Sequence, residues 1–276
     1  MGSLLAALAS YLQARQNNGR WLLRIEDIDP TREPRGAADN IIDCLSAHGL
    51  MHDGAVSFQS THSDRYEDAL SKLRQNQRLF ACRCTRSTLR RCAQQSQSNA
   101  YPETCKNLNL PEQNCALRLR LADNCRHSFE DQQMGTQCED LRKTCGDFVL
   151  RRRDGLYAYQ LAVVVDDAAQ GISEVVRGAD LLDNTVRQIH LQYALGLAQP
   201  RYFHLPLMLG NNGLKLSKQN HAPALDIRLA RQNLAQAWAS LGQKPLSNQT
   251  DCHGFLKQAI LQWNPSLIPK TCESKA

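Results

Sequence analysis

The sequence lacks the features that mark membrane and secreted proteins. No apolar run approaches the roughly 20 residues that a helix needs to cross a bilayer. No basic segment precedes the apolar residues Leu4 to Leu8, as it would in a secretory signal peptide. The N-myristoylation pattern fails because Ala6 stands where Ser or Thr is required. These absences predict a protein of the cytoplasm with no membrane association.

An excess of charge of one sign is also missing. The 33 basic and 27 acidic residues leave a net charge of +6, which permits binding to nucleic acid without demanding it. Internal repeats and low-complexity tracts are absent as well. With 276 residues and 42% hydrophobic content, the chain can bury a sizeable core, and its length predicts about two domains.

Cysteine is plentiful, but its pattern is not that of a disulfide framework. The eleven cysteines are an odd number in a chain without a signal peptide, which indicates a reducing compartment with free thiols or metal ligands. Eight of them lie between Cys82 and Cys145, where the hydrophobic periodicity weakens. We expect residues 81–146 to form an insertion in a larger fold.

Strand and helix alternate over the first eighty residues, which is typical of an α/β fold with a parallel sheet. Leu4 to Arg15 has apolar residues on one helical face and stops at Asn17-Asn18-Gly19. A strand begins at Trp21. One helix follows from Pro34 to Gly49, and another runs from Ser63, its expected N-cap, to Arg74.

Alternation and turn residues place the later elements. Cys115 to Leu121 alternates as a half-buried strand, with Arg118 and Arg120 on its polar face. Asp154-Gly155 predicts the turn of a hairpin. The elements expected beyond the insertion are strands over 147–153, 156–165 and 172–177, a helix over 181–195, and polar helices past Pro223.

The segment WLLRIEDIDPTR, residues 21–32, is the first candidate site. Its apolar half predicts a buried strand whose carboxyl end opens into a loop with Glu26, Asp27 and Asp29. Ligands bind at that edge of open α/β sheets, where carboxylates can hold a substrate ammonium or a metal. An acidic turn that only ends the strand is the alternative.

Cys82, Cys84 and Cys105, together with Tyr101, form the second candidate site. Three thiolates and a fourth ligand can hold Zn²⁺ in a tetrahedron, although tyrosine is an unusual ligand. Spare thiols are common in the insertion, and C-x-C is a weaker pattern than a repeated C-x-x-C. Spacing alone leaves both zinc binding and a chance grouping of thiols open.

Lys215 and Lys218 flank Ser217 just after the Asn212-Gly213 turn and form the third candidate site. Lysines at a loop tip can neutralise the charge that develops on a transferring phosphate. By itself, such a pair of lysines is more typical of a solvated face.

Tyr159 and Arg177 are the fourth candidate pair and are expected on neighbouring strands. The planar fork of arginine matches a carboxylate, and a tyrosine hydroxyl adds one more hydrogen bond. In the alternative, Arg177 pairs with Asp180 and Tyr159 lies in the core.

Taken together, five motifs resemble the glutamyl-Q tRNA(Asp) synthetase family, the short paralogues of bacterial glutamyl-tRNA synthetase that have no anticodon-binding domain. The resemblance runs through nearly the whole chain in the family's order. The motifs are Arg24 to Pro30 (RIEDIDP), the set Cys82, Cys84, Tyr101 and Cys105, Tyr159 to Asp167 (YQLAVVVDD), Val176 to Asp180 (VRGAD) and Lys215 to Pro223 (KLSKQNHAP).

The resemblance implies a Rossmann-like class I synthetase catalytic domain of the α/β class. Such a domain has a parallel sheet with helices on both faces, a zinc-bearing insertion and a C-terminal helical segment. The implied divisions are the first half of the catalytic domain over 1–80, the insertion over 81–146, the second half over 147–220 and the helical segment over 221–276.

It also implies a reaction. Glutamate is activated with ATP and Mg²⁺ to glutamyl-adenylate without tRNA, and then passes to the queuosine base in the anticodon of tRNA(Asp). A monomer would perform both steps. The implied roles are glutamate binding by Glu26, Tyr159 and Arg177, ATP binding by Lys215, Ser217 and the catalytic Lys218, and one structural Zn²⁺ on Cys82, Cys84, Tyr101 and Cys105.

One part of the family pattern would precede Gly2: an opening strand, a loop and a His-x-Gly-type signature. We therefore expect either a misplaced start or a degenerate paralogue, and weak glutamate-dependent ATP–pyrophosphate exchange by residues 1–276. The alternative function is that of a catalytically impaired, zinc-bearing tRNA-binding protein.

Overall fold

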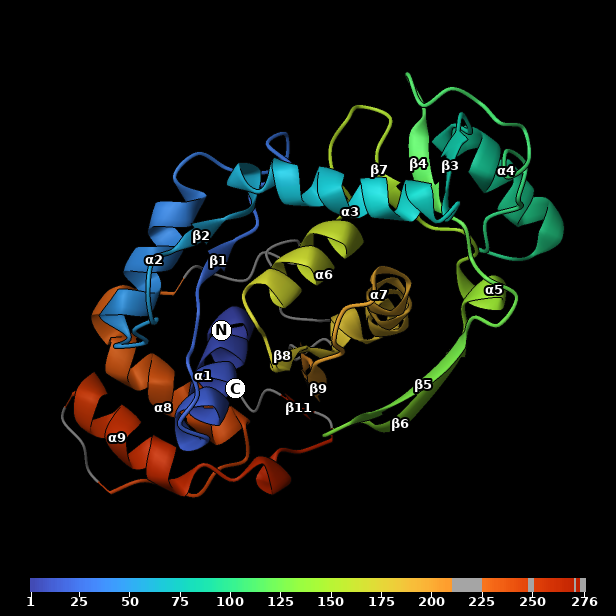
Figure 1. Cartoon of the computed structure of the whole chain (residues 1–276). Helices are drawn as coiled ribbons and strands as arrows, with labels where there is room; N and C mark the ends of the chain where they lie inside the picture. Colours follow the sequence, from blue (N-terminus) through green and yellow to red (C-terminus); the bar gives the residue numbers. More distant parts are fainter. Residues whose placement is uncertain (210–224, 248–250, 271, 274–276) are drawn as a thin grey trace.

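A computed structural model describes residues 1–209, 225–247, 251–270 and 272–273. Figure 1 shows the N-terminal helix beside the helices of the C-terminal segment at one end of the molecule, and strands from the middle of the chain at the other end. Within the described ranges, no helix is both long enough and apolar enough to cross a membrane.

The first helix and the segment after it pack against the rest of the N-terminal region. α1 (Gly2–Gln16) buries its predicted apolar face and ends at Asn17. Trp21 and Leu23 then accept hydrogen bonds from the backbone of residues 53 and 57. β1 (Arg24–Ile25) pairs in parallel with β2 (Ser57–Phe58). The strand predicted from Trp21 is thus only two residues long, and among the described residues it pairs with β2 alone.

The two helices around β2 start slightly differently from their predicted positions. α2 (Ala37–Ala47) begins after Gly36, which has a left-handed backbone, rather than at Pro34. A short 3-10 turn, η1 (Gln59–Thr61), leads into α3 (Ser63–Gln75). His62 is the N-cap residue of α3 and no side chain caps the helix, so the predicted Ser63 cap is wrong.

The middle of the chain contains more strands than its sequence indicates. β3 (Leu79–Cys82), β4 (Ala116–Leu119) and β7 (Val149–Arg151) form an antiparallel sheet, and α4 (Arg86–Ser96) follows β3. β5 (Arg126–Asp131) and β6 (Gly135–Asp140) form a hairpin that leads into α5 (Leu141–Thr144). The strands near 115–121 and over 147–153 were expected, whereas β3, β5 and β6 were not.

The predicted hairpin at Asp154-Gly155 is half correct. The turn forms, and Arg151 bridges to Tyr157 across it. The residues that follow are helical, because α6 (Tyr159–Ala169) replaces the strand expected over 156–165. Leu161 to Val165 are all buried. A run that is apolar throughout has no period that separates a buried helix from a strand.

A parallel β–α–β unit forms the centre of the molecule. It consists of β8 (Glu174–Gly178), a 3-10 turn η2 (Ala179–Leu181), α7 (Leu182–Leu195) and β9 (Arg201–Leu205). The first strand and the helix were predicted. β9 also pairs with β5, so the sheet order is β6-β5-β9-β8.

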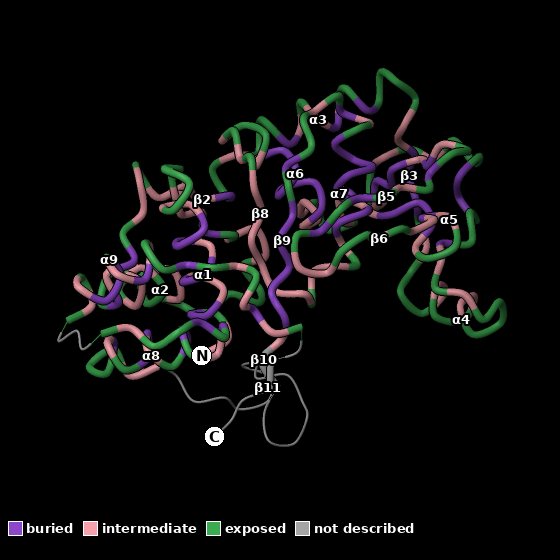
Figure 2. Tube along the Cα trace, turned by 90° about the horizontal axis from the view of Figure 1, so that it is seen from below, coloured by how far each residue is buried: buried purple, intermediate pink, exposed green. Residues whose placement is uncertain are grey.

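Helices cover both faces of this sheet, as expected for the predicted fold class. Tyr202 on β9 belongs to the core that α6 and α7 share, whereas Phe203 and Leu205 belong to the core formed with α1. In Figure 2 much of β9 is drawn as buried. Successive side chains of a strand point to opposite faces, which explains this division.

The C-terminal segment is helical, as predicted. A 3-10 turn η4 (Ile227–Leu229) precedes α8 (Ala230–Ser240), and α9 (Cys252–Gln262) precedes the turn η5 (Pro265–Leu267). Leu234, Trp238 and Phe255 from the two helices pack into the core beside α1. β10 (Met208–Leu209) pairs in parallel with β11 (Cys272–Glu273). The Asn212-Gly213 turn lies outside the described residues.

Candidate functional site

A cavity of about 810 Å³ lies between the C-terminal half of α1, the segment leading into β1, the start of α6 and the strand β8. Three predicted site residues line it: Glu26 after β1, Tyr159 at the first turn of α6 and Arg177 on β8. Residues from three distant parts of the sequence therefore meet at one cavity. Tyr159 and Arg177 lie on a helix and a strand, and not on two neighbouring strands as predicted.

Two carboxylates and one arginine form one wall of this cavity. The Arg24 guanidinium lies 2.8 Å from Asp167 and 3.8 Å from Glu26. Burial raises the pKa of Asp167, and partial burial at the wall raises the pKa of Glu26, while Arg24 opposes both shifts. The wall therefore carries more acidic than basic groups, and a ligand cation would be attracted to Glu26.

Arg177 supplies the positive charge of the same cavity. Its Nη2 donates to Thr185 Oγ1 at 2.9 Å and to Gln188 Oε1 at 2.8 Å, and its Nη1 lies 3.5 Å from the Tyr159 hydroxyl. Burial raises the pKa of Tyr159, so this phenol stays neutral and can donate a hydrogen bond. Arg177 and Tyr159 together suit a carboxylate ligand.

The other two carboxylates of the predicted acidic loop do not join Glu26. Asp27 accepts hydrogen bonds from the backbone and the hydroxyl of Ser60. Asp29 pairs with Arg32 and with Arg152. Asp27 and Asp29 therefore have local structural partners, and Glu26 is the carboxylate of this loop that lines the cavity.

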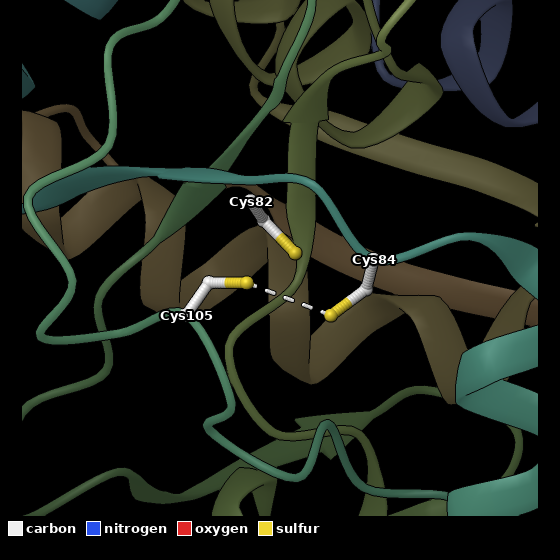
Figure 3. A group of neighbouring side chains, drawn as sticks. All are labelled: Cys82, Cys84 and Cys105. Carbon is white, nitrogen blue, oxygen red and sulfur yellow. Dashed lines mark hydrogen bonds between the residues drawn. The ribbon is translucent and has the colours of Figure 1, made fainter.

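The three cysteines of the second candidate site converge. Figure 3 shows the sulfur atoms of Cys82, Cys84 and Cys105 turned toward one another, and all three lie within 4.8 Å. The Sγ atoms of Cys84 and Cys105 are 3.6 Å apart. The Tyr101 hydroxyl lies 3.3 Å from Cys82 Sγ and accepts a hydrogen bond from the Cys105 backbone.

This donor set fits a zinc ion. Burial raises the pKa of Cys84 to about 12, and the neighbouring thiol of Cys105 adds to the shift. Three thiolates this close repel one another unless a cation lies between them. Bound zinc favours the deprotonated thiols because its positive charge stabilises them. Cysteine sulfur and one further oxygen donor would complete a closed, tetrahedral structural site.

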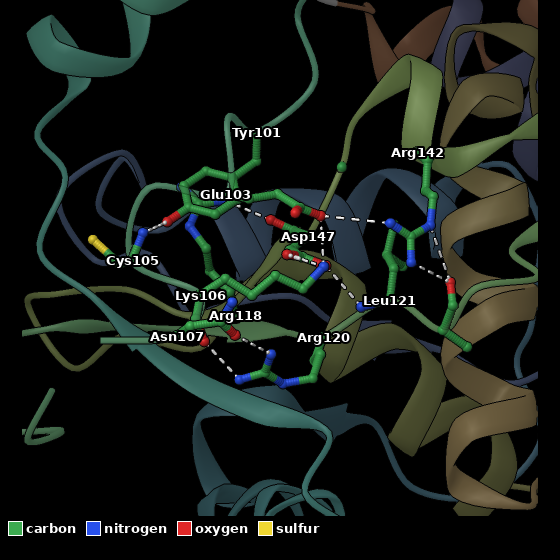
Figure 4. Close-up of polar contacts among 12 residues, drawn as sticks. Tyr101, Glu103, Cys105, Lys106, Asn107, Arg118, Arg120, Leu121, Arg142 and Asp147 are labelled. Atoms are coloured by element: carbon green, nitrogen blue, oxygen red, sulfur yellow. Dashed lines mark hydrogen bonds and ion pairs between the residues drawn. The ribbon is translucent and has the colours of Figure 1, made fainter. Parts of the chain in front are cut away.

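A network of buried charges holds Tyr101 in place (Figure 4). The Arg118 guanidinium lies 4.0 Å from the centre of the Tyr101 ring and donates to the Asp147 carbonyl at 2.7 Å. Lys106 forms an ion pair of 3.2 Å with the Asp147 carboxylate. Arg118 is buried, so its predicted place on a polar strand face is wrong. The cation–π contact with Tyr101 and the hydrogen bond to the Asp147 carbonyl take the place of hydration of its guanidinium.

The three lysine-loop residues Lys215, Ser217 and Lys218 lie outside the described residues. Two residues of the cavity were missed as site residues in the sequence. Arg24 and Asp167 belong to motifs that were recognised, but nothing in the spacing showed that they would form an ion pair at the cavity wall.

Comparison with known proteins places this geometry in context. The family model for the catalytic domain of class I tRNA synthetases (E and Q) matches residues 1–235. The chain is 47% identical over 269 residues to the glutamyl-Q tRNA(Asp) synthetase of Acinetobacter baylyi, an alignment that covers 97% of this chain and 89% of that protein. It is 45% identical over 275 residues to the protein of the same name from Pseudomonas fluorescens, covering 98% and 89%.

Solved structures show the same fold. The crystal structure of the glutamate-tRNA synthetase of Elizabethkingia anophelis superposes with a TM-score of 0.82 at 22% sequence identity. The match covers 100% of this chain and 65% of the solved chain, so this chain spans slightly less than two thirds of that protein.

Proposed function

The chain belongs to the glutamyl-Q tRNA(Asp) synthetase family, within the class I tRNA synthetases for glutamate and glutamine, and from this premise we propose how it works. It activates L-glutamate with ATP to glutamyl-adenylate. It then transfers the glutamyl group to the queuosine base in the anticodon of tRNA(Asp). The relatives are named as synthetases, which favours this function over that of a non-catalytic tRNA-binding protein.

One observation carries the proposal: a single cavity presents a carboxylate at one wall and a guanidinium at another. Glutamate has an ammonium group for Glu26 and a side-chain carboxylate for Arg177 and Tyr159. The charges of Arg24 and Asp167 neutralise each other, which leaves the Glu26 carboxylate free to bind the glutamate ammonium. An amino acid without a side-chain carboxylate would leave Arg177 with an unpaired donor, which lowers its affinity.

The lysine loop supplies the proposed ATP contacts. Lys215 and Ser217 would bind ATP, and Lys218 would act in catalysis by stabilising the charge on the phosphates as adenylate forms. Mg²⁺ bound with ATP would share that charge. The role of Glu26 and Arg177 in this step is to orient the glutamate α-carboxylate toward the α-phosphate.

Zinc has a structural role in the proposal. Cys82, Cys84, Tyr101 and Cys105 would hold one ion that joins β3 to the loop before β4. Four protein ligands leave no position for water, so the ion would supply folding energy and no reaction step.

Transfer of labelled glutamate to tRNA(Asp) tests the function. We expect label on tRNA(Asp) that contains queuosine and none on the same tRNA without it, because the queuosine hydroxyl is the acceptor. Glutamate, and not aspartate, should support ATP–pyrophosphate exchange. Label on both tRNAs would overturn the acceptor, and the absence of both exchange and transfer would support the non-catalytic alternative.

A further inference from the structure

Arg177 is held from behind by a buried histidine. Its Nε donates to Nε2 of His204 at 3.0 Å. The two residues face each other on the neighbouring parallel strands β8 and β9. The His204 side chain has no solvent exposure and stacks beside the Tyr202 ring, with ring centres 6.1 Å apart. His204 therefore contacts the base of the guanidinium, on the side away from water.

Asp131 completes this chain of contacts from a different part of the sequence. It is the last residue of β5, and its carboxylate accepts a hydrogen bond from Nδ1 of His204 at 2.6 Å. The same carboxylate accepts backbone hydrogen bonds from Gln133, Met134 and His204. Its side chain is fully buried, and these donors hold it as an anion.

These bonds fix where the protons lie. Arginine only donates, so Nε2 of His204 must present its lone pair to Arg177. The ring proton must then lie on Nδ1, where it is donated to Asp131. His204 is consequently a neutral ring in a single tautomer. If the ring proton were on Nε2, two N–H donors would point at each other, and Arg177 Nε could not donate to His204.

The result is a guanidinium with little freedom to turn. His204 holds Nε, and Thr185 and Gln188 from α7 hold Nη2. The remaining nitrogen, Nη1, has the weaker contact to Tyr159 at 3.5 Å, and Tyr159 lines the cavity. A donor fixed in advance loses less conformational entropy when it binds a carboxylate than a free arginine does.

We propose that Asp131 and His204 are positioning residues, which hold the guanidinium of Arg177 in the orientation that binds the side-chain carboxylate of glutamate. The proposal rests on the proposed function for the identity of the ligand. The fixed geometry of Arg177 itself depends only on the contacts above. Neither Asp131 nor His204 lines the cavity, so both act through Arg177 and not by touching the substrate.

Three substitutions separate positioning from folding. In Asp131→Asn, the amide can donate to Nδ1 of His204 and drive the ring proton to Nε2, which breaks the bond to Arg177. In His204→Asn, the short amide can still reach Asp131 but not Arg177. His204→Gln has a longer amide whose oxygen can reach Arg177, so it should retain more affinity than His204→Asn. A matched control is His190→Asn, since His190 is also a buried histidine but contacts His127 and Arg78.

The test combines calorimetric titration with L-glutamate and NMR of the full chain. We expect Asp131→Asn and His204→Asn to weaken glutamate binding by roughly tenfold or more, a loss of about 1.4 kcal/mol, with ATP binding unchanged. Ring-nitrogen spectra of the wild type should show the His204 proton on Nδ1, and the Arg177 Nε–H signal should be slow to exchange. His190→Asn should lower the melting temperature without either effect.

Three results decide the matter. Unchanged glutamate binding in both variants, with wild-type affinity measurable, would overturn the positioning role. A rapidly exchanging Arg177 Nε–H, or a His204 ring protonated on Nε2, would overturn it without any reference to the ligand. If the NMR results are as expected but the wild type does not bind glutamate, the positioning geometry stands and the proposed function fails.

Discussion

Arg24 on β1 and Asp167 on α6 form an ion pair of 2.8 Å at the wall of the cavity, and each side chain is only 13% exposed. The pair joins the segment before the acidic loop to the helix that carries Tyr159. Because of this pair, the two carboxylates of the wall differ in what they can bind. Asp167 is neutralised within the protein, and Glu26, which lies 3.8 Å from the same guanidinium, remains available to a ligand.

Removing Arg24 should be costly. Arg24→Met leaves Asp167 buried without its partner, and breaking a buried ion pair from one side lowers the free energy of unfolding by about 3 kcal/mol or more. Urea unfolding of the variant measures this. Arg32→Met is the matched control, because Arg32 is 81% exposed in its pair with Asp29. We expect a loss below about 1 kcal/mol there. Equal losses would contradict the assigned role of the buried pair.

Glu26→Gln should stabilise the protein while it removes glutamate binding. The pKa of Glu26 is raised by partial burial, so the native state disfavours the carboxylate relative to the unfolded chain. That cost is absent below the unfolded-state pKa of ~4.3 and fully present above the folded-state pKa. The melting temperature of the variant should therefore exceed that of the wild type at pH 7.5 and equal it near pH 4. A lower melting temperature at pH 7.5 would show that Glu26 stabilises the fold.

Among the cysteines of the insertion, only the three clustered ones should be needed for zinc binding. Purified protein should carry about one zinc per chain, and Cys82→Ser should lose it because a closed site needs all its ligands. Cys145→Ser should keep the metal, since the Cys145 thiol donates to backbone carbonyls outside the cluster. Metal analysis of both variants checks this. Equal zinc loss from both would remove the assignment.

Gly146 should be required for the zinc site although it is not a ligand. Its φ of 64° lies in the left-handed region, and an added Cβ would lie 2.6 Å from the Tyr101 backbone nitrogen. Gly146→Ala would thus displace the Tyr101 N–H from the Cys145 carbonyl that it now reaches at 2.9 Å. We expect weaker zinc retention against a chelator.

Gly155→Ala provides the control for that experiment. Gly155 has a φ of 88°, but an added Cβ would have no atom within 4 Å. The Gly155→Ala variant should lose stability through backbone strain alone and keep its zinc. If both alanine variants retain zinc equally against the chelator, the packing of Gly146 on Tyr101 has no role in the site.

Helical periodicity and turn residues predicted much of the fold. The apolar face of α1 and the β8–α7 connection follow from the spacing of apolar residues in the sequence. The helix at Tyr159 could not be predicted in this way, because Leu161 to Val165 is buried on all sides and carries no period. β5 was hidden for the opposite reason. Its inward residues include Asp131, a charge that a hydrophobic pattern does not place in a core.

The site was predictable only as separate motifs. Glu26, Tyr159 and Arg177 were found in the sequence, but their meeting at one cavity depends on how the fold places the end of β1, α6 and β8. The contact of Arg177 with His204 is set by the register of two strands that lie on either side of a whole helix. No local sequence pattern encodes that register. Asp131, which contacts His204, comes from a third segment of the chain, β5.

In the proposed function, the cavity binds glutamate through Arg177. Calorimetric titration of L-glutamate into the wild type, Arg177→Ala and Arg152→Ala tests it most directly, since Arg152 pairs with Asp29 and Asp154 outside the cavity. Arg177→Ala should weaken glutamate binding by roughly 100-fold, as expected when a carboxylate loses a charged partner worth about 3 kcal/mol. Arg152→Ala should bind glutamate as the wild type does. Equal glutamate affinity in the wild type and in Arg177→Ala would contradict the account.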